Sequence, residues 1–217
     1  MNPADLFAWV LLLLGSSAAL GLVILLTGLA RVFARAPRLA QAPELPVDGS
    51  LTVVVPAYNE AANIAACLSS VLCSQSPCSV WRVLLVDDQS SDATVAIAHE
   101  TVSGLAAKQG LELQQQCDGP DARFALLDAG PRPAGERWVG KNWACSRAME
   151  QVNSDWVLFV DADVRLQPAT LRRALAQATA DGADLLSLAP RLGCGCLAEW
   201  MVQPIMASLL GLGFPIE

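Results

Sequence analysis

Residues 51–60 read Leu-Thr-Val-Val-Val-Pro-Ala-Tyr-Asn-Glu, and this stretch decides the fold. A β-branched run that stops at turn-forming and acidic residues is typical of a strand buried on both faces of a parallel sheet. The pattern recurs at residues 83–92, Val-Leu-Leu-Val-Asp-Asp-Gln-Ser-Ser-Asp, and at 156–163, Trp-Val-Leu-Phe-Val-Asp-Ala-Asp. Ligands bind open α/β sheets at the carboxyl ends of the strands. We therefore expect three strand ends to bring acidic side chains to one crevice.

Extended and helical patterns alternate along the rest of the folded region. Strands are predicted at 51–55, 81–86, 111–116, 123–129, 156–160 and 184–188, and helices at about 60–74, 92–103, 141–152 and 168–180. Ser91 or Asp92 is expected to cap the second of these helices and Gly104 to end it. This alternation predicts an α/β fold with a mostly parallel sheet, flanking helices and right-handed crossovers.

An uncharged apolar stretch from Leu6 to Ala30 precedes the folded region. Its roughly 25 residues make a helix of roughly 37 Å, longer than the ~30 Å hydrocarbon layer of a membrane. A cleaved signal peptide is the alternative, but Asp5 and no Lys or Arg precede the stretch, and the stretch is too long for such a peptide. We therefore predict a transmembrane anchor in residues 1–35. Residues 36–50, with three prolines, are predicted to be a linker.

Charge and cysteine content narrow the location and the function. Arg31, Arg35 and Arg38 follow the apolar stretch and no Lys or Arg precedes it, which predicts an inner-membrane protein whose folded region faces the cytoplasm. Seven cysteines at irregular spacing indicate reduced thiols rather than a disulfide framework. A net charge of -7 argues against nucleic-acid binding. His99, the only histidine, leaves no basis for a histidine-dependent triad or zinc site.

Asp161 and Asp163 are the strongest candidates for metal binding. In an extended segment they share one side while Ala162 turns away. Two carboxylates this close repel each other, and a hard divalent cation removes the repulsion. The pair therefore predicts Mg²⁺ or Mn²⁺ bridging to a diphosphate, whereas an ordinary acidic surface turn is the alternative.

Asp87, Asp88 and Lys141 are candidates for binding a nucleotide. The two aspartates are not needed to cap the following helix, and a carboxylate at this edge accepts hydrogen bonds from a base or ribose. Leaving such a polar group unpaired costs about 1–3 kcal/mol, which enforces selectivity. Lys141 precedes a predicted helix, whose N-terminus favours a phosphate. A solvated surface lysine is the alternative.

These motifs together resemble the inverting nucleotide-sugar glycosyltransferases of family 2, which have the GT-A fold. The resemblance covers about residues 51–190 and rests on segments 53–60, 86–94, 140–141 and 159–164, in that order. The anchor, the Gly-Pro-Arg-Pro-x-Gly-x-x-Trp-x-Gly-Lys stretch at 130–141 and the Trp-Met-Val-Gln-Pro segment at 200–204 are most similar to the hopanoid-associated (hopene-associated) branch. The resemblance implies that residues 51–190 form a GT-A donor-binding domain. It implies transfer of a sugar from a nucleotide-diphosphate sugar, a UDP-sugar, to a lipid or lipid-linked acceptor.

The resemblance also implies roles for the residues that bind the nucleoside. Pro56, Tyr58 and Glu60 would line the nucleotide pocket, with Glu60 near the ribose. Asp87 or Asp88 would bind the base, which we expect to be uracil.

For the diphosphate end, the resemblance implies a divalent metal. Lys141 would lie by the nucleotide or its phosphates, Asp161 would approach the ribose or the metal, and Asp163 would be the principal metal ligand. The metal would neutralise the charge that develops on the leaving diphosphate.

One part of the family pattern is missing. The acceptor-activating carboxylate of the family normally lies in a separate acidic motif well downstream of Asp-x-Asp, and no acidic residue after Asp163 stands in such a motif. We therefore expect a C-terminally truncated chain whose general base lies beyond Glu217. Two other functions stay open: a non-catalytic nucleotide-binding module and a nucleotidyltransferase.

Residues 191–217 form an apolar segment, the incomplete acceptor half on this interpretation. It is expected to be an interfacial helix beside the bilayer or a core helix uncovered by the truncation. Pro204 and the glycines of the segment argue against a full membrane span.

Overall fold

The computed structural model of the 217-residue chain describes residues 2–35, 38–41, 43–109, 123–135, 137–138, 140–189, 193, 195–199, 202–203 and 206. Two units are distinguished by their internal packing. The folded domain comprises Leu39–Leu188, and the second unit comprises Met1–Arg38 with Ala189–Glu217. The predicted strand at 111–116 and most of the segment after residue 189 lie outside the described residues.

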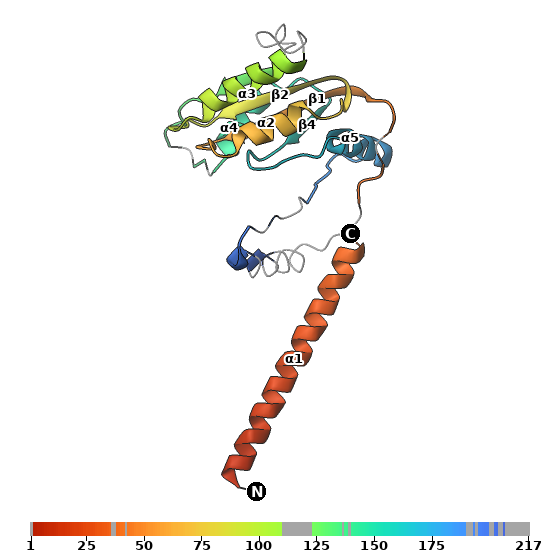
Figure 1. Ribbon diagram of the computed structural model, residues 1–217, viewed down its shortest axis with the longest axis vertical. Coiled ribbons are helices and arrows are strands. Elements are labelled where there is room, and N and C mark those ends of the chain that lie inside the picture. Colours follow the sequence, from red (N-terminus) through yellow and green to blue (C-terminus); the bar gives the residue numbers. More distant parts are fainter. Residues whose placement is uncertain are drawn as a thin grey trace. The chain divides into compact units, whose positions relative to one another are not determined.

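Helices and strands alternate in the described residues (Figure 1). Their order is α1 Pro3–Arg35, β1 Val47–Ala57, α2 Ile64–Leu72, β2 Cys78–Asp87, α3 Thr94–Gln109, β3 Phe124–Asp128, α4 Asn142–Met149, β4 Trp156–Phe159 and α5 Thr170–Asp181. The predicted βαβ alternation is therefore confirmed, with element ends that differ by several residues.

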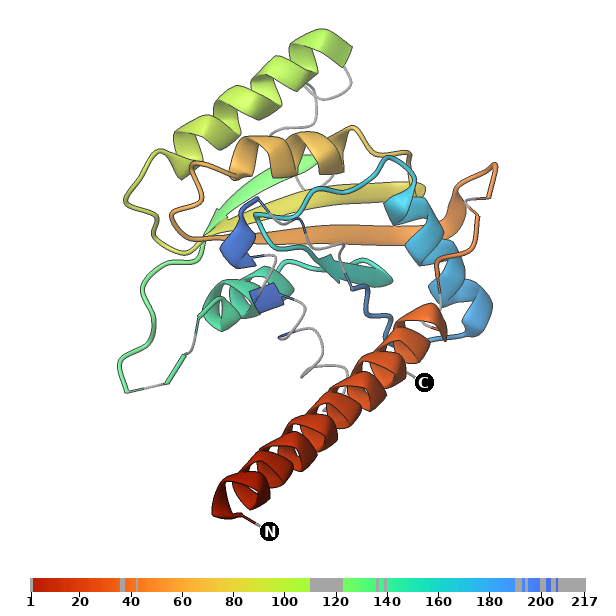
Figure 2. The same ribbon diagram turned by 60° about the horizontal axis from the view of Figure 1, so that its bottom comes forward.

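Within the described residues the four strands form one sheet in the order β3-β2-β1-β4. Each neighbouring pair is parallel, and Ala57 at the end of β1 lies opposite Asp87 at the end of β2. The chain steps from β1 outward to β3 and then crosses back to the other side of β1. Because crossovers are right-handed, this reversal places α4 on the face opposite α2 and α3 (Figure 2).

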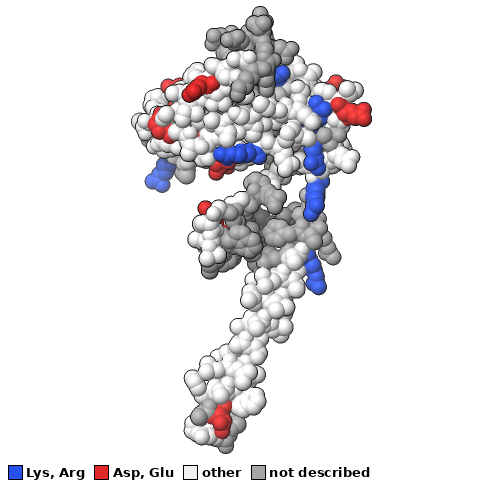
Figure 3. Space-filling view, viewed as in Figure 1, with Lys and Arg blue, Asp and Glu red and all other residues white. Residues whose placement is uncertain are grey.

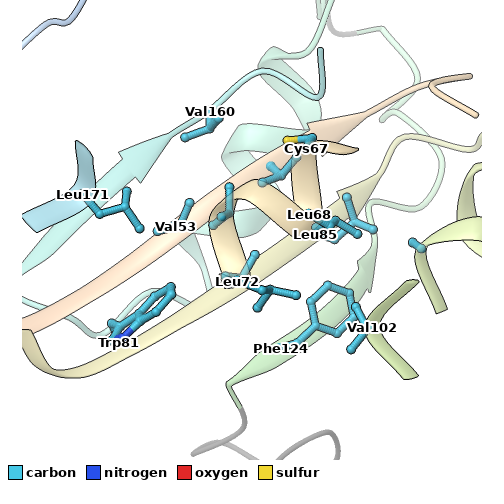
Figure 4. Close-up of a cluster of buried hydrophobic side chains, with 14 of the residues drawn as sticks. Val53, Cys67, Leu68, Leu72, Trp81, Leu85, Val102, Phe124, Val160 and Leu171 are labelled. Carbon is cyan, nitrogen blue, oxygen red and sulfur yellow. The ribbon is translucent and has the colours of Figure 1, made fainter. Parts of the chain in front are cut away.

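The core lies on both faces of the sheet, as the Val53-Val54-Val55 run predicts. Val53 and Val55 belong to the larger cluster, under α2, α3 and α5, whereas Val54 belongs to the smaller cluster under α4. All three valines are fully buried, because successive side chains of a strand point to opposite faces. Figure 4 shows part of the larger cluster, in which side chains of α2 meet those of β1 and β2.

The prediction of a strand at 184–188 is wrong. These residues are described and form no strand, and within the described part of the chain β4 is the edge of the sheet. Leu185 is 86% exposed. Leu185, Leu186 and Leu188 instead line a mostly apolar cavity of about 100 Å³ with residues of β4 and α5. A short apolar run matches the pattern of a buried strand, but only pairing with a neighbour makes it one.

Gly104 does not end α3, contrary to the prediction. The helix continues to Gln109, because Val102 and Ala106, on either side of Gly104, are buried in the core. Gly104 has none of the positive φ values seen in the chain's turn glycines. Tertiary packing thus overrides the local preference of glycine for a helix end.

We expect Gly104→Ala to raise the free energy of unfolding by about 0.5–1 kcal/mol, because alanine loses less backbone entropy in a helix. Nothing lies within 4 Å of a Cβ atom built on Gly104, so the added methyl group clashes with no neighbour. Urea unfolding of the full chain in detergent, followed by tryptophan fluorescence, measures the change.

Gly182→Ala is the matched control and should lower the free energy of unfolding. Gly182 is the C-cap of α5, with φ of 60°, and a Cβ atom there also meets nothing within 4 Å. The left-handed conformation alone should then cost about 1 kcal/mol. Destabilisation by both substitutions would contradict a helical Gly104.

Helix α1 is uncharged between its two ends, as Figure 3 shows for one side of it. Its residues Asp5–Gly28 form a helix long and apolar enough to span a membrane, with a mean hydropathy of 2.4. Its large apolar side chains are exposed, as at Leu13 and Phe7. Length and composition of this helix are thus compatible with the predicted anchor.

The segment before β1 is attached to α5 of the folded domain. Arg173 donates hydrogen bonds to the carbonyl oxygens of Leu39 and Ala40, and Arg172 donates to that of Glu44 at 3.1 Å. β1 begins at Val47. The predicted linker, residues 36–50, therefore belongs to the folded domain from Leu39 on.

Candidate functional site

A cleft of about 460 Å³ lies at the carboxyl edge of the sheet, within the usual size range of small-molecule sites. Its lining comes from the loops after β1, β2, β3 and β4 and from the start of α4. The lining residues are Pro56, Ala57, Tyr58, Glu60, Asp88, Arg132, Gly140, Lys141, Ala144, Asp161, Ala162 and Asp163. The cleft lies beside the ends of β1 and β4, where the strand order reverses, and such a position is the ligand site of open α/β sheets.

Most residues that the sequence singled out meet in this cleft. Those that line it are Pro56, Tyr58, Glu60, Asp88, Lys141, Asp161 and Asp163. Asp87 does not line it and is 92% buried, since its exposed fraction is 8%. One oxygen of Asp87 accepts a hydrogen bond from the Ser90 amide at 3.1 Å, and the other has no hydrogen-bond partner among the described residues. Of the two alternatives, the structure brings Asp88 into the cleft.

Asp88 is held by a residue that the sequence did not single out for the site. The Nη2 atom of Arg132 donates to Oδ2 of Asp88 at 2.6 Å. The Asp88 side chain is 6% exposed and the Arg132 side chain 43%, so the carboxylate is buried beneath a partly solvated cation. Charge-assisted pairs of this kind are short and directional. Arg132 therefore fixes one oxygen of Asp88.

The sequence contained only a weak signal for Arg132. It lies in the Gly-Pro-Arg-Pro stretch, which supported the resemblance to a family branch but no site. Its partner Asp88 is 44 residues away in the chain. No local pattern predicts a pair that forms only after the loop between β3 and α4 folds over the end of β2.

Asp161 and Asp163 lie in a turn and not, as predicted, in an extended segment. β4 ends at Phe159, and the amide of Val164 donates to the carbonyl oxygen of Asp161 at 3.0 Å. Ala162, 3% exposed, packs into the larger core cluster. The burial of this methyl group, rather than strand geometry, leaves the aspartates on either side of it lining the cleft.

Lys141 is the N-cap of α4, as its place before a predicted helix implied. Its Nζ atom pairs with Oδ1 of Asp161, and both side chains are 54% exposed. An ion pair this exposed is worth at most about 1 kcal/mol. The pair can therefore open at little cost when another charged group enters the cleft.

The acidic pair fits a divalent cation that is shared with a substrate. Among the described residues, no group of three or more His, Cys, Asp or Glu side chains could hold a metal ion, which does not suit a structural zinc site. Mg²⁺ is usually bound by one or two carboxylates together with water and substrate phosphates. Asp161 and Asp163 supply two such carboxylates beside the cleft.

Cys67 lies beneath this turn but does not take part in chemistry. Its Sγ atom is 3.6 Å from the carbonyl oxygen of Asp161, to which it donates a hydrogen bond. Burial raises the pKa of the Cys67 thiol to about 12. The thiol therefore stays protonated and is no nucleophile at neutral pH.

Three curated proteins show how the chain compares with its relatives. It is 28% identical over 136 residues to the glycosyltransferase AglE of Haloferax volcanii, and this match covers 63% of the chain and 38% of AglE. It is 33% identical over 143 residues to the succinoglycan biosynthesis protein ExoO of Rhizobium meliloti, covering 66% and 34%. It is 29% identical over 131 residues to the 4,4'-diaponeurosporenoate glycosyltransferase of Staphylococcus haemolyticus, covering 60% and 28%. The chain thus spans only 28% to 38% of the length of these relatives.

Solved structures of glycosyltransferases are similar over part of their length. A mannosyltransferase from Pyrobaculum calidifontis in complex with GDP-Man and Mn²⁺ is 27% identical, with a TM-score of 0.47 and coverage of 76% of this chain and 41% of that one. Residues 1–349 of TarS from S. aureus in complex with UDP-GlcNAc are 23% identical, with a TM-score of 0.47 and coverage of 68% and 36%.

The family assignment rests on a match across most of the folded domain. The family described as "Glycosyl transferase family 2" matches residues 52–111 and 132–212, which include all the cleft residues from the ends of β1, β2 and β4. The α/β fold with a parallel sheet and flanking helices, expected as a GT-A fold, is confirmed. With more than half of its residues matched, the chain belongs to glycosyl transferase family 2.

Proposed function

We propose that the cleft is the donor site of a metal-dependent glycosyltransferase that uses a nucleotide-diphosphate sugar, a UDP-sugar. The observation that carries this proposal is the convergence of Asp88, Lys141, Asp161 and Asp163 on one cleft of about 460 Å³. One acid suits a base, two acids suit a metal, and a lysine suits a phosphate. Membership of glycosyl transferase family 2 supports the same reaction class.

The nucleoside binds at the end of the cleft formed by β1 and β2. The carboxylate of Asp88, fixed by Arg132, accepts a hydrogen bond from an N–H group of the base. Tyr58, 60% exposed, offers its ring face to the base. Pro56 lines the same pocket, and Glu60 receives the ribose hydroxyls. Each of these residues lines the cleft.

The diphosphate binds between the start of α4 and the turn after β4. Lys141 Nζ exchanges its partner Asp161 for the phosphate oxygens, because a diphosphate carries more charge than one carboxylate. Asp161 is then free to join Asp163, the principal ligand, in holding Mg²⁺ or Mn²⁺. A divalent cation at this position supplies Lewis acidity to the leaving diphosphate.

Helix α1 supports a location in the membrane and a lipid or lipid-linked acceptor. A span over Asp5–Gly28 followed by Arg31, Arg35 and Arg38 gives an inner-membrane protein with the folded domain in the cytoplasm. An anchored enzyme suits a lipid or lipid-linked acceptor. The motifs shared with the hopanoid-associated branch favour hopanoid metabolism. Two matched relatives carry the names of different compounds, succinoglycan and 4,4'-diaponeurosporenoate, so relatives alone do not choose the acceptor.

A donor screen tests this function. The full chain in nanodiscs of bacterial lipid is incubated with radiolabelled UDP-sugars or GDP-mannose, with and without Mn²⁺ or Mg²⁺. We expect the donor to bind tightly only with a divalent ion, and release of UDP with transfer of label to the lipid phase to require that ion and an acceptor-activating base. Nucleotide-sugar binding without any turnover would favour a non-catalytic nucleotide-binding module. Neither binding nor turnover with any donor would refute the donor site.

A further inference from the structure

The loops after β1 and β2, residues 58–63 and 88–93, bend at equivalent positions. Ala57 and Asp87 are opposite each other at the strand ends, and the second residue after each has a positive φ: 55° at Asn59 and 63° at Gln89. No other non-glycine residue in the described part of the chain has a positive φ. This conformation costs a non-glycine residue energy, least for asparagine and aspartate. Such outliers persist where surrounding contacts fix them.

Asn59 is fixed by contacts with the neighbouring loop. Its amide donates to Ser90 Oγ at 2.9 Å, and its Oδ1 atom accepts a hydrogen bond from the Ser91 amide at 2.8 Å. The Ser91 hydroxyl also reaches Oδ1, at 3.3 Å. The Asn59 carboxamide thus bridges the loop after β1 to the loop after β2.

A second set of bonds continues this link towards α3. The Glu60 amide donates to Thr94 Oγ1 at 2.8 Å, and the Ala61 amide donates to Asp92 Oδ2 at 3.1 Å. Asp92 Oδ1 accepts from the Thr94 amide at 2.9 Å and from the Thr94 hydroxyl. The hydrogen bond from the Thr94 hydroxyl lowers the pKa of the Asp92 carboxyl, so Asp92 remains an acceptor at neutral pH.

The hydrogen bonds between the two loops matter for the cleft because the residues next to Asn59 and Gln89 line it. Tyr58 and Glu60, on either side of Asn59, line the cleft, as does Asp88, next to Gln89. Tyr58 is 60% exposed, so its ring has little packing to hold it. The backbone at Asn59 therefore sets the direction of the residues on both sides.

We propose that Asn59 is a positioning residue of the donor site, which presents Tyr58 and Glu60 to the nucleoside by bridging the two loops. This inference rests on the proposed function. It predicts that loss of the Asn59 carboxamide weakens donor binding more than it weakens the fold. In steady-state kinetics the donor KM should rise while kcat changes little, because the residue touches no reacting atom.

The test compares UDP binding by variants of the full chain in detergent with Mn²⁺ present. Asn59→Gly keeps the left-handed backbone accessible and removes the side chain, including the carboxamide. It should raise the Kd of UDP about fivefold to tenfold, as expected for lost hydrogen bonds. Asn59→Asp keeps the acceptor oxygen and the backbone preference, and it should restore most of the affinity.

Ser50→Ala is the matched control for a lost side-chain bridge. Ser50 Oγ donates to Asp155 Oδ2 at 2.7 Å and accepts from the Asp155 amide at 2.9 Å, at the opposite end of β1 from the cleft. Its loss should leave the Kd of UDP within about twofold, whatever its effect on urea unfolding.

Two results overturn the inference alone: Asn59→Gly binds UDP as tightly as the wild-type chain, or Ser50→Ala weakens binding as much as Asn59→Gly does. A failure of the wild-type chain to bind UDP overturns the proposed function, and this inference with it. The wild-type titration therefore separates the two failures.

Discussion

Replacing Asp163 by Asn is expected to lower nucleotide-sugar turnover at least about hundredfold and to remove its dependence on a divalent ion. Stabilisation of a leaving group by a bound cation is worth several kcal/mol, and each 1.36 kcal/mol is about tenfold in rate. Asp163 borders the cleft in the turn after β4, and the described residues contain no group of three or more such ligands that could hold a metal ion. UDP release at varied Mn²⁺ concentration measures the effect.

The control for this substitution removes the same charge outside the cleft. Asp181 is exposed at the end of α5, where its carboxylate accepts a hydrogen bond from Gln177 at 2.6 Å. Asp181→Asn should leave the rate and its metal dependence within about twofold, since exposed charges contribute little. If Asp163→Asn kept the metal dependence of the wild-type chain, Asp163 would not be the principal ligand.

Asp88→Asn is expected to weaken UDP binding about tenfold to hundredfold. The substitution keeps the shape of the side chain but removes the charge that both a base N–H group and Arg132 need. Hydrogen bonds to charged groups contribute about 1.5–3 kcal/mol, and Arg132 would lose its buried partner. Titration calorimetry with UDP and Mn²⁺ measures the loss.

Asp87→Asn provides the comparison one residue away. Asp87 has the same chemistry and similar burial but does not line the cleft. Its bond from the Ser90 amide survives in an asparagine through the amide oxygen, so UDP affinity should fall by less than about threefold. If Asp87→Asn weakened UDP binding more than Asp88→Asn does, Asp87 would be the residue that binds the base.

The sequence predicted the sheet well because its central strands are buried on both faces. Val53, Val54 and Val55 can pack into both hydrophobic clusters only in a central strand, which has a covered face on each side. The acidic residues after each apolar run marked the strand ends. Residues 184–188 show the limit of the same rule. Apolar composition predicts burial, while strand formation needs a paired neighbour that composition does not name.

Site residues that directly follow a strand could be predicted from the sequence. Site residues that are placed by tertiary contacts could not. The approach of Asp88 and Asp163 follows from parallel strands that share one carboxyl edge. The pairing of Arg132 with Asp88, across 44 residues, has no local signature. The choice of Asp88 over Asp87 was left open for the same reason, because the direction of each side chain depends on the loops packed around it.

The donor site itself is tested most directly by titrating the full wild-type chain with UDP in a calorimeter, with and without Mn²⁺. We predict saturable binding of one UDP per chain with Mn²⁺. Binding without Mn²⁺ should be much weaker, because Lys141 must then neutralise the diphosphate without the charge of the metal. Absence of UDP binding in both conditions, by a chain whose circular dichroism shows it to be folded, would contradict the account.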